Sequence, residues 1–161
     1  TTEDILVGNG SIVTPTGELV ARGFMSFDLS GVPAGATIQG AELRFYQKAV
    51  EGAPYAKLGN LQLKHVVYGD SLGADAYNTP ALDSAILASQ TNPGSWYVIA
   101  DQTISSWLEN DLGAGRSRLQ LRLQFTAETD GDGEEDWIGV EPGTTFIGSS
   151  NSPQLIVTYV R

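Results

Sequence analysis

Hydrophobic and polar side chains alternate along most of this chain, which is the pattern of β-strands with one buried face. The clearest case is residues 118–126, where Leu and Phe alternate with Arg, Gln and Thr. The other predicted strands show the same alternation or a short apolar run: residues 19–29, 37–48, 58–68, 96–100, 137–141, 144–147 and 154–160. Glycine and proline separate these runs, as turns require. The pattern therefore predicts an all-β protein.

Local signals add turns and helices to this outline. Asn9-Gly10 favours a tight hairpin turn between a strand over residues 3–7 and a return strand over 11–14. Residues 81–88 are consistent with a short helix. A second helix is expected to be capped by Asp101 or Thr103 and to end near Gly113 or Gly115. We expect one domain over residues 1–161, an antiparallel β-sandwich of jelly-roll type with one or two short helices.

Composition and charge exclude several classes of function. The net charge is −10, and only nine Lys and Arg residues are scattered over the 161 residues. Because nucleic-acid binding needs clustered basic residues, nucleic acid is a poor candidate partner. The chain has no Cys, which excludes thiolate catalysis, disulfides and Cys–zinc sites. No apolar run approaches the ~18 residues of a membrane-spanning helix, so no membrane insertion is expected.

Three motifs carry a resemblance to a known family. The first has Arg22, then Phe27-Asp28-Leu29, a Pro33-Ala34-Gly35-Ala36-Thr37 elbow and Ala41, Leu43 and Tyr46; Asp101-Gln102-Thr103 and Pro153–Tyr159 follow. Together they resemble the DNRLRE family of β-sandwich domains, related to carbohydrate-binding modules. The resemblance implies a non-catalytic domain, secreted or attached to the cell surface, often beside polysaccharide-degrading enzymes or adhesins. Some members bind acidic polysaccharides such as alginate. The segment 68–94 has no part in the match.

Polar side chains on the predicted strands suggest where a sugar would bind. Arg44 and Tyr46 point away from the core side of one strand, and Gln120, Arg122 and Gln124 do so on another. If the strands share a sheet, two guanidiniums would suit uronate carboxylates. The alternative is a solvated face with ordinary cross-strand pairs.

Aromatic residues give further candidates for stacking against a sugar. Tyr77 lies in the unmatched segment, and Trp137 follows an acidic loop. Trp96-Tyr97 follows a turn, and Trp96 or Trp137 could lie at an edge of the sandwich, whereas Trp107 is expected in the core. For Trp96 and Trp137, packing in the core is the competing interpretation.

The acidic loop, residues 128–136, holds six carboxylates in nine residues. Asp130, Asp132, Glu134 and Asp136 offer hard oxygen ligands on a glycine-containing backbone, which suits Ca²⁺. An EF-hand is excluded because Glu135 occupies the position of the turn glycine. We expect either a structural calcium site or a solvated acidic loop.

No residue pattern indicates catalysis. The single histidine, His65, is expected in a strand without a neighbouring nucleophile motif, and no pair of carboxylates stands out. Low lysine content and many small polar residues favour an extracellular location. The sequence therefore predicts a non-catalytic extracellular domain of a larger surface protein that binds polysaccharide or a cell-surface glycan. The alternatives are a structural spacer or an assembly or adhesion domain of a surface protein or filament, and a glycan-active enzyme.

Overall fold

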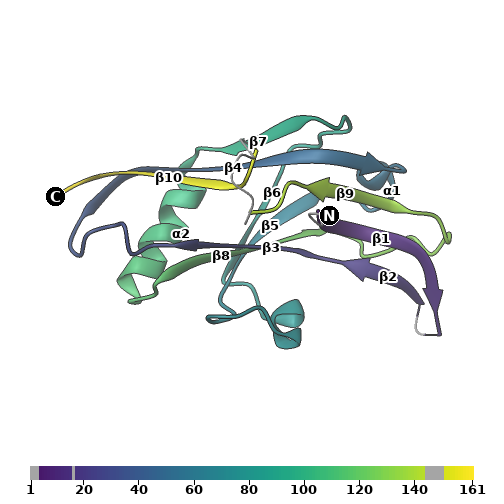
Figure 1. The fold of residues 1–161 in the computed structure, drawn as a ribbon, viewed down its shortest axis with the longest axis horizontal. Coiled ribbons are helices and arrows are strands. Elements are labelled where there is room, and N and C mark those ends of the chain that lie inside the picture. Colours follow the sequence, from purple (N-terminus) through teal and green to yellow (C-terminus); the bar gives the residue numbers. More distant parts are fainter. Residues whose placement is uncertain (1–3, 16, 144–150) are drawn as a thin grey trace.

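Two antiparallel sheets face each other in the computed structural model, which describes residues 4–15, 17–143 and 151–161. Sheet A has the strand order β10-β4-β9-β1-β2, and β7 also pairs with β4. Its strands are β1 (Ile5–Thr14), β2 (Gly17–Ala21), β4 (Thr37–Glu51), β7 (Ser95–Ile99), β9 (Asp136–Val140) and β10 (Gln154–Val160). Sheet B has the order β3-β8-β5-β6, formed by β3 (Gly23–Asp28), β8 (Arg118–Phe125), β5 (Leu61–Val66) and β6 (Asp83–Ile86). The predicted all-β sandwich is confirmed (Figure 1).

The long strand β4 organises sheet A. Leu43 pairs with Leu155 of β10 and with Ile99 of β7, so these two strands lie on opposite edges of β4. Gln47 likewise pairs with both Val140 of β9 and Ser95 of β7. Strands β9 and β10 therefore lie end to end along one edge of β4, and β7 covers the middle of the other edge.

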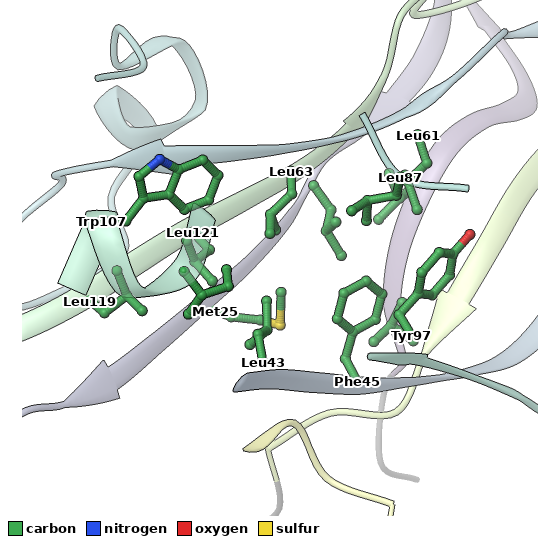
Figure 2. Packing of buried hydrophobic residues seen from close by; sticks show 14 of the residues in the cluster. Met25, Leu43, Phe45, Leu61, Leu63, Leu87, Tyr97, Trp107, Leu119 and Leu121 are labelled. Atoms are coloured by element: carbon green, nitrogen blue, oxygen red, sulfur yellow. The ribbon is translucent and has the colours of Figure 1, made fainter. Parts of the chain in front are cut away.

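The core lies between the sheets and consists mainly of aliphatic side chains (Figure 2). Leu43 and Phe45 of β4 face Leu63 of β5 and Leu121 of β8 across this layer, and all four are fully buried. The alternation seen in the sequence places these residues inward because successive side chains of a strand point to opposite faces. Figure 2 also shows Tyr97 among them, stacked on Phe45 with ring centroids 4.7 Å apart.

Helix α2 (Gln102–Gly113) closes one end of the sandwich between β4 and β8 (Figure 1). Asp101 caps it by accepting a hydrogen bond from the Thr103 amide at 2.9 Å. Ile104, Trp107 and Leu108 are buried in the core. The predicted helix, its cap and the core position of Trp107 are confirmed.

The predicted hairpin turn at Asn9-Gly10 is wrong. Strand β1 runs straight through both residues, and the turn lies after Thr14. Asn9 pairs with Val20 of β2 on one side and with Asp136 of β9 on the other. Pairing on both sides holds this dipeptide extended and overrides its turn preference.

The predicted single strand over residues 19–29 is two strands in different sheets. The chain leaves β2 of sheet A at Arg22 and enters β3 of sheet B at Gly23. A side chain at Gly23 would meet the side chains of Ile5 and Val7 at 2.7 and 2.9 Å. Glycine therefore lets the crossing strand pass close to β1.

The predicted helix over residues 81–88 is also wrong. Residues 83–86 form β6, which pairs with β5 through Ala85–Leu63 and Ser84–Lys64. A one-turn helix, α1 (Pro54–Lys57), and a 3₁₀ helix, η1 (Ala74–Asn78), occur where the pattern gave no helix. The predicted strand over 144–147 lies outside the described residues. Across the described ranges, no helix combines the length and apolar character needed to cross a membrane.

Candidate functional site

An aromatic pair lies on the outer face of sheet A. The inward side chains of β4 alternate with the outward ones, so Arg44 and Tyr46 face away from the core. Tyr46 pairs with Trp96 of β7, and their ring centroids are 5.2 Å apart at a 57° tilt. Trp96 is 37% exposed, although tryptophan side chains are mostly buried in folded proteins. This face therefore presents two adjacent rings to solvent.

Polar and apolar side chains surround these rings. Arg44 pairs with Val98 of β7 and with Gln154 of β10, and its guanidinium bonds to the Glu42 carboxylate. Arg44, Trp96, Val98 and Gln154 line a shallow hollow of about 530 Å³. We call Arg44, Tyr46, Trp96, Val98 and Gln154 the sheet A platform. For Trp96 the sequence alone left two interpretations open, exposure at an edge and packing in the core. Alternation over a five-residue strand is too short to show which face of the sheet the side chain is on.

Trp137 lies farther along the same outer face, opposite Glu51 of β4. Five residues separate Tyr46 from Glu51, which corresponds to roughly 16 Å of strand. The indole lies over Gly139, and its Nε1 donates to Glu135 at 3.2 Å. This hydrogen bond, together with one from Ser11, lowers the pKa of the Glu135 carboxyl. Trp137 is half-buried and stands apart from the sheet A platform.

Arg122 does not lie beside Arg44, because the condition that their two strands share a sheet is not met. Arg122 belongs to β8 of sheet B, and only 5% of it is exposed. Its Nη1 donates to the carbonyls of Ala76, Tyr77 and Thr79, at 3.4, 3.1 and 2.8 Å. Burial, followed by the charge of Arg22, lowers the pKa of this guanidinium. Arg122 therefore holds the segment 67–80 onto sheet B.

Gln120 and Gln124 belong to the same covered face. Gln120 accepts hydrogen bonds from the Tyr68 and Gly69 amides and donates to the Gly69 carbonyl at 2.6 Å. Gln124 accepts from Arg122 Nε at 2.9 Å. The predicted open face of Gln120, Arg122 and Gln124 is thus a contact surface for the segment 67–80, the teal excursion at the bottom of Figure 1.

Tyr77 is half-buried, and its ring is already in contact with a cation. The Arg22 guanidinium lies 4.0 Å from the ring centroid and also bonds to the Tyr77 carbonyl and to Glu128. The Tyr77 hydroxyl donates to the Val20 carbonyl at 3.4 Å. The ring proposed for sugar stacking therefore stabilises a loop instead.

The acidic loop connects β8 to β9 at the end of the sandwich where α1 lies (Figure 1). One carboxylate oxygen from each of Asp130, Asp132 and Asp136 lies within 4.8 Å of the other two. Glu134, the fourth predicted ligand, instead contacts the Lys57 ammonium at 2.9 Å. The structure thus brings three of the four residues together.

Lys57 is the residue that the sequence did not connect to this loop. Its ammonium lies 2.6 Å from Asp132 and 3.2 Å from Asp136. These contacts raise the pKa of Lys57, with Asp132 the largest cause and Glu134 the next. In turn, Lys57 and then the Glu134 amide lower the pKa of Asp132. Lys57 lies in a four-residue helix 75 positions before Asp132, so the sequence gives no signal for this contact.

Three further residues, Glu18, Gly8 and Gly52, hold the backbone of the acidic loop. Glu18 accepts hydrogen bonds from Asn9 Nδ2 at 2.9 Å, from the Thr129 hydroxyl and from the Gly133 amide. Gly8 and Gly52 have positive φ angles of 135° and 64°. A side chain at Gly8 would overlap the Asp136 carbonyl, and one at Gly52 would overlap the Glu135 carbonyl. The end of the loop is therefore held between two glycines.

His65 lies in β5, in agreement with the prediction of a strand histidine, and is 1% exposed. Its Nε2 contacts both oxygens of the buried Asp111 at 2.9 and 3.0 Å, and its ring stacks on Trp107. Arg116 also binds Asp111, at 2.8 Å. This arrangement ties α2 to sheet B inside the protein and presents no imidazole nitrogen at the surface.

Comparisons with protein-family models and with curated proteins find no match for this chain. The resemblance of its three motifs to DNRLRE domains therefore stays a prediction. The class of protein that the structure defines is an antiparallel β-sandwich in which, among the described residues, the segment 67–80 covers the outer face of sheet B and no such segment covers Arg44 and Trp96 on sheet A.

Proposed function

We propose that this chain is a non-catalytic, extracellular carbohydrate-binding domain whose ligand lies on the sheet A platform. The observation that carries the proposal is the pair of half-buried Tyr46 and exposed Trp96 beside Arg44. Sugars stack their C–H faces on aromatic rings, and a few placed polar groups orient them. Arg44 and Gln154 supply such groups at the hollow. A domain of a larger surface protein would suit this role.

The charges around the platform favour a polysaccharide with few carboxylates. Arg44 can present paired donors to one uronate carboxylate. Arg122 cannot assist because it is buried in the other sheet. The net charge of −10 also repels a polyanion. We therefore expect neutral or sparsely acidic chains to bind better than polyuronates.

A glycan array followed by titration calorimetry on any hit tests the proposal. Trp96→Ala is expected to weaken binding at least about tenfold, since truncating a hot-spot aromatic typically removes about 2 kcal/mol or more and about 1.4 kcal/mol corresponds to tenfold. Leu72→Ala, an exposed apolar residue of the segment that covers sheet B, is the control and should leave binding unchanged. Absence of any polysaccharide binding, or binding that depends on Trp137 and not on Trp96 and Arg44, would refute this site.

A second candidate function, as a spacer or assembly domain, is favoured by one observation. Strands β6 and β7 flank a groove of about 590 Å³ whose lining includes Ile86 and Val98, both more than half exposed. Each strand is paired on one side only within the described sheets. Concentration-dependent self-association that is blocked by Ile86→Lys, in the absence of glycan binding, would favour this function over the first.

A further inference from the structure

Two hollows of the sandwich surface adjoin along β7. The hollow of the sheet A platform, of about 530 Å³, and the groove between β6 and β7, of about 590 Å³, are both lined by Trp96 and Val98. We call this groove the edge groove. Trp96 and Val98 are two residues apart on β7, so their side chains leave the same face of the strand. A ligand that lies on the platform can therefore continue into the edge groove without a break in its contact with β7.

One wall of the edge groove is the free edge of β7. In an antiparallel pair, the N–H and C=O groups of alternate residues point away from the partner strand. The Gln90 side chain donates to the Trp96 carbonyl at 2.9 Å, so the backbone groups of Trp96 and Val98 point away from β4. Within the described sheets, β7 pairs with no strand except β4. The Val98 N–H and C=O therefore face the edge groove without a strand partner.

The other wall of the edge groove comes from β6. The Leu87 amide donates to the Leu61 carbonyl of β5 at 2.9 Å. Alternation then turns the N–H and C=O of Ile86 away from β5, and in the described sheets no other strand pairs with β6. The Ile86 side chain is exposed and lines the groove together with Asp101. The edge groove thus combines apolar side chains with backbone donors and acceptors that no strand uses.

We propose that the sheet A platform and the edge groove form one track that binds the interior of an uncharged polysaccharide chain over several consecutive sugars. This inference rests on the proposed glycan-binding function and assigns the ligand class of that site. Trp96 stacks on a central sugar, and the following sugars lie in the edge groove between Ile86 and Val98. The β7 side of the groove extends from Trp96 to Asp101, roughly 16 Å of extended chain, which is longer than one sugar ring.

The lining of the edge groove favours an uncharged sugar chain. Sugar hydroxyls both donate and accept hydrogen bonds, which matches the N–H and C=O groups of Ile86 and Val98. The C–H faces of the sugars match the two apolar side chains. No Lys or Arg is among the described residues that line the groove, and Asp101 would repel a uronate. A second copy of the chain is a poorer occupant, because both copies carry a net charge of −10.

Titration calorimetry with oligosaccharides of increasing length tests the track. The probes are cello-, manno-, xylo- and malto-oligosaccharides, each from the disaccharide to the hexasaccharide, and their parent polysaccharides. In a series that binds, the Kd of the hexasaccharide should be at least about tenfold lower than that of the disaccharide, because sugars in the edge groove add contacts. Equal Kd values at all lengths, with binding that still depends on Trp96, overturn the track and leave the platform in place. Absence of binding by every probe refutes the platform and the track together.

Ala88→Trp separates the edge groove from the platform. Ala88 is exposed and lines the edge groove but not the platform hollow, so a large ring there fills the groove without entering the core. The variant should bind the disaccharide as the wild type does and lose the gain with length. Ile86→Ser, which removes an apolar contact without adding bulk, should reduce the same gain. Leu72→Ala, outside both hollows, is the control and should keep it. A gain with length that survives both groove variants refutes the track.

Analytical ultracentrifugation distinguishes a glycan in the edge groove from a second copy of the chain. We expect the protein without glycan to sediment as a monomer. Self-association that Ile86→Lys abolishes would assign the edge groove to a second copy and overturn the track.

Discussion

The outer faces of the two sheets look alike in sequence and differ completely in the structure. Arg44 of β4 and Arg122 of β8 both alternate with buried leucines on long strands. Arg44 is exposed beside an aromatic pair, whereas Arg122 is buried beneath the segment 67–80. Alternation tells which side chains leave the core. It does not tell what covers them afterwards.

The covering segment explains the difference. It follows β5 and passes over β8, where Arg122 and Gln120 bind six of its backbone groups. Sheet A has no equivalent segment over β4 and β7 among the residues described. The outer face of sheet B therefore contributes to stability through this segment, whereas the Arg44 side of sheet A has no such cover among the residues described.

The largest expected effect is on the free energy of unfolding, which should respond differently to substitution of Arg122 and of Arg44. Arg122→Leu should lower the free energy of unfolding by about 2–4 kcal/mol, because buried carbonyls lose their donor. Arg44→Leu should change it by less than about 0.5 kcal/mol, as is usual for exposed residues. Urea unfolding measures both. A similar loss for the two variants would contradict the contrast between the faces.

A smaller effect is expected for two glutamines. Gln120→Ala removes hydrogen bonds to residues 68 and 69 and should destabilise the protein by about 1–2 kcal/mol. It should also accelerate proteolytic cleavage within residues 67–80. Gln154→Ala, on the sheet A platform, is the control and should alter neither property. Equal protease resistance in the two variants would show that Gln120 does not hold the segment.

The smallest expected effect is on the pH dependence of stability, in which the contacts of Arg122 and the contacts of Lys57 should differ. Arg122 binds carbonyls, which do not titrate, whereas Lys57 binds Asp132. The folded pKa of Asp132 is lowered, so this contact contributes stability above the unfolded pKa of about 3.9 and loses it as the pH falls through the folded value. The raised pKa of Lys57 preserves the contact until above about pH 10.

Unfolding curves at several pH values check this prediction. The difference in stability between wild type and Lys57→Met should be constant from about pH 5 to 9 and shrink as the pH falls below the unfolded pKa of Asp132, about 3.9. The difference between wild type and Arg122→Leu should not change over this acidic range. A Lys57→Met difference that does not shrink below about pH 4 would show that Asp132 is not its main partner.

Most of the fold could be predicted from local patterns, because most strands and α2 carry their own signal. The wrong predictions share a cause, because each of these segments is shaped by strands that are distant in sequence. Asn9-Gly10 is extended because strands flank it on both sides, and residues 83–86 form a strand because β5 offers a free edge. The break at Arg22 depends on Gly23 passing close to β1.

The candidate sites were only partly predictable for the same reason. Arg44, Tyr46 and the three aspartates followed from alternation and from loop composition. The burial of Arg122 depends on residues 76–79, and the cation at the acidic loop comes from Lys57. Neither contact could be predicted from the spacing of residues along the chain.

Gly8 and Gly52 have a consequence for how this sequence can vary. Both admit the backbone of residues 135–136 at close range, so any side chain there would push the loop away from the sandwich. The exposed carboxylates at 130 and 132 carry no such constraint. Mutational drift could thus add or remove charges on the loop while the two glycines stay fixed.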